Sequence, residues 1–172
     1  MSEQTEATKA YLAGGCFWCL EALYTRLPGV LAVQSGFSGG SVANPSYEQV
    51  CTGTTGHAEA VEITFDPSRV SYRDILERFW KFHDPTTLNR QGADVGEQYR
   101  SVIFYVDDEQ REIAEQSKSA AQPAFDSPIV TSIEPLRAFW PAETWHQSYF
   151  DHNPDAPYCR FVIAPKVAKL KS

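Results

Sequence analysis

Hydrophobic residues recur along the chain with two periods, one typical of helices and one typical of strands. The helical period is clearest between residues 17 and 27, where the apolar side chains stand at i, i+3, i+7 and i+10: Phe17, Leu20, Tyr24 and Leu27. Pro28 and Gly29 follow and end this predicted helix. A short apolar run, Tyr11-Leu12-Ala13, precedes it and indicates the end of a strand. The pattern therefore predicts a strand and a helix joined by the short segment 14–16.

The strand period is clearest at residues 58–65, where Glu59 shares one face with three apolar side chains, Val61, Ile63 and Phe65. A carboxyl group in phase with an apolar face is unusual, because acids are rarely buried. If this face is the core side, Glu59 is desolvated and holds its proton more tightly. The alternative is a strand-end glutamate that reaches solvent, which we consider less consistent with the candidate chemistry described below.

The rest of the chain predicts further elements of both kinds. Strands are expected at 30–37, 101–106 and 129–133, helices at 46–51, 71–83, 107–121 and 144–150, polar loops at 38–45 and 84–97, and an irregular segment at 151–159. Ser71 begins a capping box, and His83 near the end of that helix suits the helix dipole, so we assign it no catalytic role. This order predicts an α/β fold: a two-layer α/β sandwich with a mixed sheet, a ferredoxin-like (split βαβ) core and an irregular C-terminal tail.

Composition and charge narrow the class of protein. The 172 residues suit one domain, and we expect a disordered lead-in at 1–8 followed by a single catalytic domain at 9–172, acting as a monomer. The net charge of −7 disfavours nucleic acid and anionic membranes as partners, because both require clustered Lys and Arg. The sequence shows no apolar leader and no membrane-spanning run, which predicts a cytoplasmic location. Thiols stay reduced there, so the four cysteines favour catalysis or metal binding over structural disulfides.

Cys16 is the strongest candidate for chemistry. Gly14 and Gly15 permit a sharp turn between the predicted strand and helix, which places Cys16 at the helix N-terminus. Unpaired N–H groups and the helix dipole favour an anion there, so we expect a lowered thiol pKa and a nucleophilic thiolate. Phe17 and Trp18 follow directly and would wall an apolar pocket. A lone cysteine is more often a small buried hydrophobe, but its position after two glycines favours function.

Further motifs extend the pattern around Cys16. In chain order they are Gly15-Cys16-Phe17-Trp18, Gly56-His57-Ala58-Glu59-Ala60-Val61, Gln91-Gly92 to Asp94, Gln98-Tyr99-Arg100-Ser101, His146-Gln147 and Asn153-Pro154. Together they resemble the methionine sulfoxide reductase A family, and the resemblance spans about residues 9 to 169. It implies the same fold and the reduction of the S epimer of methionine sulfoxide, free or in proteins, to methionine. It also implies thioredoxin as the reductant and no metal or organic cofactor.

The resemblance carries roles to individual residues. The family's nucleophile matches Cys16, its glutamate acid matches Glu59, and its substrate-binding residues match Phe17, Trp18, Tyr47, Asp94 and Tyr99. These residue types suit the reaction, because a sulfoxide sulfur becomes a good electrophile only when its oxygen is protonated or strongly hydrogen-bonded. The thiolate attacks, a buried acid gives the proton, phenols hold the oxygen and aromatic rings seat the S-methyl group.

The recycling thiol is the least determined part of the prediction. Attack leaves Cys16 as a sulfenic acid, which a second thiol condenses to a disulfide. Many family members have glycine at the position of Cys19, whose spacing from Cys16 permits a disulfide but whose thiol we expect to face away from the pocket. Cys159 lies in the Pro-rich segment, which we expect to be mobile, and a resolving cysteine in such a tail is the family's common arrangement. We predict Cys159 as the resolving cysteine, then Cys19, and a packed Cys51.

Two other classes of protein compete with this interpretation. Cys16-Phe17-Trp18-Cys19 is a CxxC at a strand-to-helix turn, which is typical of thioredoxin-like disulfide oxidoreductases, but that class does not explain Glu59 on an apolar face. A zinc module could use Cys16, Cys19, Cys51 and Cys159, but structural zinc sites normally have two close ligand pairs and this chain has one. We therefore expect no metal.

Overall fold

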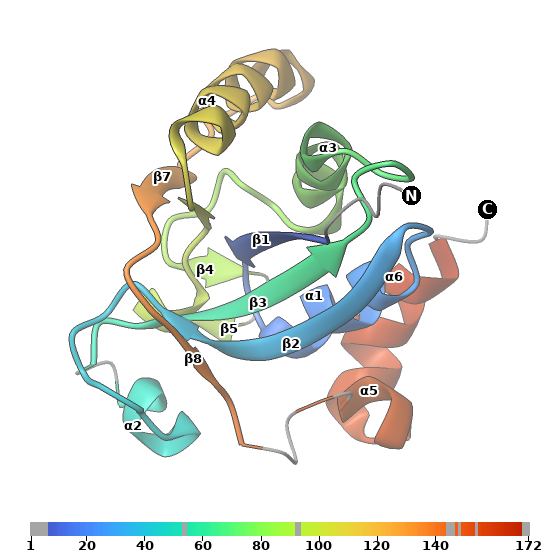
Figure 1. Ribbon diagram of the computed structural model, residues 1–172. Helices are drawn as coiled ribbons and strands as arrows, with labels where there is room; N and C mark the ends of the chain where they lie inside the picture. Colours follow the sequence, from blue (N-terminus) through green and yellow to red (C-terminus); the bar gives the residue numbers. More distant parts are fainter. Residues whose placement is uncertain are drawn as a thin grey trace, which may run out of the picture.

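The computed structural model describes residues 7–52, 55–91, 94–143, 147, 149–153 and 155–169. Within these residues, six strands form one sheet (Figure 1). In spatial order they are β7 (Ser132–Pro135), β6 (Val102–Tyr105), β1 (Thr8–Ala13), β3 (Ala58–Phe65), β2 (Val30–Ser38) and β8 (Phe139–Pro141). Of the expected lead-in, residues 1–6 lie outside the described part, and Thr8 already begins β1.

The four central strands, β6-β1-β3-β2, have the ferredoxin-like order. Each neighbouring pair among them is antiparallel. Helix α1 (Phe17–Thr25) connects β1 to β2, and helix α3 (Tyr72–Phe82) lies between β3 and β6 in the chain, which makes the split βαβ arrangement. At one edge β7 pairs parallel with β6, so the sheet is mixed. The expected two-layer α/β sandwich with a split βαβ core is confirmed.

Strand β7 begins later than the sequence pattern predicts. A strand was expected at 129–133, whereas pairing with β6 starts at Ser132. The N–H of Ile129 donates to the side chain of Gln122 at 2.9 Å, and the N–H of Val130 donates to the carbonyl of Pro85 at 2.8 Å. Because these two donors are satisfied outside the sheet, the ladder cannot include them.

Two helices begin at capping boxes that satisfy their first N–H groups. Helix α3 starts with the predicted capping box, in which Ser71 and Asp74 bond each other's backbone, and α2 (Tyr47–Cys51) starts with a second box at Ser46. Helix α4 (Asp108–Ala121) packs beside α3 and continues into the 3₁₀ turn η2 (Gln122–Ala124) (Figure 1). Helix α1 contacts β2 and β3, so the helices form the second layer of the sandwich.

Burial along β3 follows the predicted alternation. Val61, Ile63 and Phe65 enter the large core under the helices, whereas Ala58 and Ala60 enter a smaller cluster on the other face of the sheet. Glu59 is in phase with the first set and is fully buried. The interpretation of Glu59 as a desolvated residue on the core side is therefore confirmed, and its strand-end alternative is wrong.

The polar segment 84–97 is folded rather than a plain loop. It contains β4 (Arg90–Gln91) and β5 (Asp94–Val95), which pair antiparallel, and the 3₁₀ turn η1 (Glu97–Tyr99) follows. Gly92 and Ala93 lie outside the described residues. The side chain of Gln91 bonds both backbone groups of Asp84, one of them at 2.9 Å, and so closes the segment upon itself. The folded segment therefore fixes the positions of Asp94 and Tyr99.

Of the irregular segment expected at 151–159, residues 153, 155 and 156 lie outside any helix, whereas helical elements stand on both sides of them. Helix α5 (Tyr149–His152), the π-helical turn η4 (Cys159–Ile163) and helix α6 (Ala164–Lys169) lie beside α1 (Figure 1). Ile163 and Val167 enter the large core, and this tertiary burial outweighs the Pro-rich local sequence. The helix expected at 144–150 falls mostly on residues 144–146 and 148, outside the described part. No described helix is long and apolar enough to cross a membrane.

Candidate active site

Cys16 lies at the sharp turn that the sequence predicts between β1 and α1. Gly15 has φ +91°, and a Cβ there would lie 2.7 Å from Cγ of Gln91, so only glycine fits this turn without strain. Cys16 is the N-cap of α1, with 7% of its surface exposed. The N–H of Gly15 donates to the carbonyl of Tyr99 at 3.2 Å, which ties the turn to η1.

Glu59 reaches the same helix N-terminus from β3. Its Oε1 accepts the N–H of Phe17 at 3.1 Å, while its buried Oε2 has no hydrogen-bond partner among the described residues. Burial raises the pKa of Glu59 to about 8, although the Phe17 N–H, which favours the carboxylate, opposes this shift. At neutral pH the carboxyl group therefore holds a proton beside Cys16.

Aromatic side chains surround the turn. The ring of Trp18 stacks on Tyr149 at 3.8 Å between centroids and on Tyr47 at 6.4 Å, and the fully buried ring of Phe17 lies 6.1 Å from Tyr47. Burial, followed by the nearness of Glu59, raises the pKa of the phenols of Tyr47 and Tyr99, so both remain hydrogen-bond donors. The structure thus brings an apolar wall and two phenols to Cys16 and Glu59.

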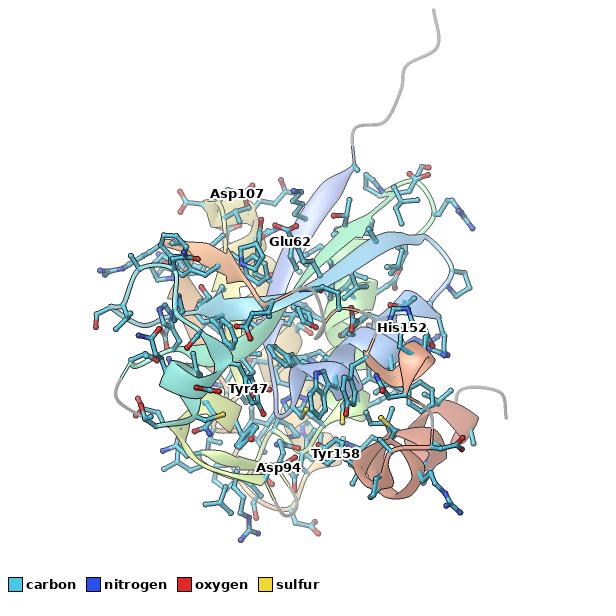
Figure 2. The ribbon with its side chains drawn as sticks, turned by 90° about the horizontal axis from the view of Figure 1, so that it is seen from below. Tyr47, Glu62, Asp94, Asp107, His152 and Tyr158 are labelled. Carbon is cyan, nitrogen blue, oxygen red and sulfur yellow. The ribbon has the colours of Figure 1, made fainter. Side chains whose placement is uncertain are left out.

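Asp94 meets the C-terminal segment at this site. The hydroxyl of Tyr158 donates to Asp94 Oδ2 at 2.6 Å and lies 3.5 Å from the sulfur of Cys19. Figure 2 shows Tyr47, Asp94 and Tyr158 on one side of the molecule, with Glu62 and Asp107 away from them. Sequence analysis missed Tyr149 and Tyr158. The only sequence signal for them was an aromatic side chain in a segment that also held another candidate. That candidate is Cys159, which directly follows Tyr158.

The two cysteines of the CxxC differ in acidity, and the expected lowering of the Cys16 pKa is wrong. Burial raises the pKa of Cys16, and its hydrogen bond to Cys19 and the nearby Glu59 raise it further, against the Trp18 N–H. The same hydrogen bond lowers the pKa of Cys19 to about 7. Desolvation therefore outweighs the helix terminus at Cys16. The sulfur of Cys19 faces Cys16 and Tyr158, so the expectation that it points away from the pocket is also wrong.

The remaining cysteines occupy positions opposite to those expected. Cys159 is fully buried at the first residue of η4 and is close enough to Cys19 to raise its own pKa, after burial as the larger cause. It is not on a mobile tail. Cys51 is exposed at the end of α2 rather than packed in the core. Among the described residues, no three or more His, Cys, Asp and Glu side chains form a group that could hold a metal ion. His146 and Pro154 lie outside those residues.

Comparison with known proteins gives one consistent result. The family model described as peptide methionine sulfoxide reductase matches residues 8–172. The peptide methionine sulfoxide reductase MsrA of Saccharolobus solfataricus is 56% identical over 161 residues, which cover 94% of this chain and 91% of that protein. The corresponding protein of Leptospira borgpetersenii is also 56% identical over 161 residues, covering 94% and 92%.

One solved structure is similar over the same range. The reduced form of Mxr1 from Saccharomyces cerevisiae superposes with a TM-score of 0.86 at 33% identity, covering 92% of each chain. The family model matches nearly the whole chain, and both of these relatives are more than 50% identical to it. The chain belongs to the peptide methionine sulfoxide reductase family and is an oxidoreductase.

Proposed function

We propose that the chain reduces the S epimer of methionine sulfoxide, free or in proteins, by transfer of the sulfoxide oxygen to Cys16. The observation that carries this proposal is the Glu59 carboxyl group, which is protonated at neutral pH and keeps one buried oxygen without a partner among the described residues. A buried unpartnered polar atom is costly, so its retention points to a ligand that completes it. The sulfoxide oxygen is such a ligand, because it accepts the proton that Oε2 would donate.

The first step uses the groups around Cys16. The S-methyl group packs against the rings of Phe17 and Trp18, and the sulfoxide oxygen accepts hydrogen bonds from Glu59, Tyr47 and Tyr99. Cys16 sulfur attacks as the oxygen gains the Glu59 proton, and the thiol proton of Cys16 restores the carboxyl group. Sulfoxide and thiol become thioether and Cys16 sulfenic acid, so atoms balance and Glu59 is unchanged. Donors held in place beforehand stabilise the charge that develops on oxygen.

Recycling begins within the CxxC. Cys19 lies three residues after Cys16, at the start of α1, and its interaction with the Cys16 thiol lowers its pKa, which favours the thiolate. Attack of Cys19 on the Cys16 sulfenic acid forms a disulfide and releases water. Cys159 lies near Cys19 and is the thiol that attacks the Cys16–Cys19 disulfide in a following exchange step. This order reverses the prediction from sequence, because Cys159 is buried in a helical turn rather than carried on a mobile tail.

Thioredoxin is the reductant that we propose for the final step, with the chain acting as a monomer in the cytoplasm. The thioredoxin proposal draws on the family membership and on a second yeast structure, whose title names Mxr1 in complex with Trx2. That structure has a TM-score of 0.61 at 22% identity, over 87% of this chain and 88% of that chain, so its likeness to this chain concerns the fold alone.

The test of this function is an assay on the separated epimers of a methionine sulfoxide peptide, with dithiothreitol as reductant. We expect the S epimer to be reduced and the R epimer to remain. Cys16→Ser should abolish the reaction, because a hydroxyl oxygen attacks sulfur poorly and cannot be converted to a sulfenic acid, while Cys51→Ser serves as the matched thiol control and keeps it. Reduction of the R epimer, or substantial activity in Cys16→Ser, would contradict the proposal.

A further inference from the structure

His83 is a buried titratable residue that the proposed reaction does not use. It follows the last residue of α3, and 8% of its surface is exposed. Burial lowers its pKa to about 4, so the imidazole is neutral at neutral pH. The expectation that it acts as a cation on the helix dipole is therefore wrong, and its role must be sought in the bonds of the neutral ring.

Those bonds have one consistent direction. Nδ1 lies 2.6 Å from the carbonyl of Phe79, and because a carbonyl only accepts, Nδ1 carries the proton. Nε2 of the neutral ring must then accept, and it lies 2.7 Å from the hydroxyl of Ser101. The Ser101 oxygen is in turn 2.7 Å from the hydroxyl of Thr131, which donates to it. The chain of donors thus runs from Thr131 through Ser101 to His83 and ends on α3.

The ring also supports the turn that carries Cys16. A Cβ on Gly14 would lie 2.8 Å from Cδ2 and 3.0 Å from Cγ of His83, so the backbone of the turn rests directly on the imidazole. Phe79 packs against the imidazole, with ring centroids 4.0 Å apart, and its Cε1 would lie 3.0 Å from the same Cβ. Gly14 precedes Cys16 by two residues, so a displacement of the ring would be transmitted to the N-terminus of α1.

Ser101 links the same ring to the opposite part of the site. It follows Tyr99 by two residues, and Tyr99 accepts the N–H of Gly15 at 3.2 Å. His83 and Ser101 thus flank the segment 84–100, which carries Asp94 in β5 and Tyr99 in η1. A hydrogen bond between these two residues closes the base of that segment next to the Cys16 turn.

We propose that the hydrogen bond between His83 and Ser101 is a clasp that positions the Cys16 turn relative to Tyr99 and Asp94. Both are positioning residues, since neither touches the substrate. The proposal rests on the proposed function and deepens it. It assigns the alignment of the nucleophile Cys16 with the oxygen-binding phenol of Tyr99 to the buried hydrogen bond between His83 and Ser101. Small displacements of reacting groups cost large factors in rate, so loss of the clasp should slow the first turnover.

Two histidine variants separate the two bonds of the ring. His83→Asn keeps a donor for the Phe79 carbonyl but cannot reach Ser101, whereas the longer amide of His83→Gln can accept the Ser101 hydroxyl. Ser101→Ala removes the clasp from the other end and leaves the imidazole in place. Thr131→Val is the matched control, because it removes the next hydroxyl of the same chain and leaves the clasp.

The measurements are the single-turnover rate and the KM for the S-sulfoxide peptide, each on protein shown to be folded by thermal unfolding. We expect His83→Asn and Ser101→Ala to lose about tenfold or more in rate and to raise KM, with His83→Gln and Thr131→Val within about threefold of the unchanged chain. Unchanged rates in His83→Asn and Ser101→Ala would overturn the proposal. An equal loss in Thr131→Val would also overturn it, because that result indicates general core packing. Failure of the proposed function would be seen separately, as no reduction of the S epimer by the unchanged chain or as substantial activity in Cys16→Ser.

Discussion

Burial sets the protonation of individual residues at this site. Glu59 is isolated from solvent and keeps its proton, whereas the helix N-terminus that was expected to ionise Cys16 is too weak to offset desolvation of the thiol. The alternation of β3 made the burial of Glu59 predictable, because a period of two assigns a face to every residue. The acidity of Cys16 was not predictable, because its raised pKa depends first on burial by tertiary packing and then on Cys19 and on Glu59 from β3.

The buried Glu59 should also cost stability as the pH rises. A carboxyl whose pKa is raised on folding contributes stability that is present below its unfolded pKa and is lost as the pH rises through the folded value, here about 8. We therefore expect Glu59→Gln to stabilise the protein by an amount on the order of a few kcal/mol at pH 8 and by much less at pH 5. The amide oxygen still accepts the Phe17 N–H.

The measurement is the free energy of unfolding by denaturant for both proteins at the two pH values. Glu62→Gln is the matched control, because Glu62 lies three residues further along β3 on the other face, with a salt bridge to Lys9 and a hydrogen bond from Tyr11. Equal stability of the unchanged chain and Glu59→Gln at pH 8 would show that Glu59 does not carry a raised pKa.

Local patterns predicted some elements and tertiary contacts determined others. The period of α1 and the capping box of α3 lie within their own residues, so the sequence located both. The pairing of β4 with β5 and the late start of β7 depend on bonds to distant residues such as Gln91 and Pro85. The C-terminal helices form against α1, which is why the Pro-rich local sequence of that segment misled the prediction.

Cys19 in α1 and Cys159 at the start of η4 lie on two elements in contact, which leads to a prediction about how the Cys16 sulfenic acid is reduced. Cys19→Ser should keep the first turnover and dithiothreitol-driven activity but lose most thioredoxin-driven turnover, because Cys19 is the thiol that we propose attacks the Cys16 sulfenic acid. Cys159→Ser should lose less, since the first disulfide still forms within α1. Peptide mapping after one equivalent of substrate should find Cys16 bridged to Cys19 in Cys159→Ser. A bridge from Cys16 to Cys159, with normal recycling in Cys19→Ser, would restore the order predicted from sequence.

Across the whole molecule, the site is assembled from segments that are far apart in the chain. The Cys16 turn, β3, α2, the hairpin of β4 and β5 and the C-terminal segment meet near the N-terminus of α1. Figure 2 shows three of their side chains, Tyr47, Asp94 and Tyr158, on one side of the molecule. Among the described residues, the structure brings Cys16, Glu59, Tyr47, Asp94 and Tyr99, which were predicted from the sequence, to this region. Tyr149 and Tyr158 were not, because only the packing of the C-terminal helices against α1 shows that they belong to the site.

The central claim is that Glu59 gives the proton while Cys16 takes the oxygen, and the pH dependence of the first turnover tests it most directly. We predict that the single-turnover rate on the S epimer falls as the pH rises through about 8, where Glu59 loses its proton. Glu59→Gln should be slower by ~10²–10⁴-fold and should lack this fall. A loss of less than about tenfold across the pH range, or the same fall above pH 8 in Glu59→Gln, would contradict the claim.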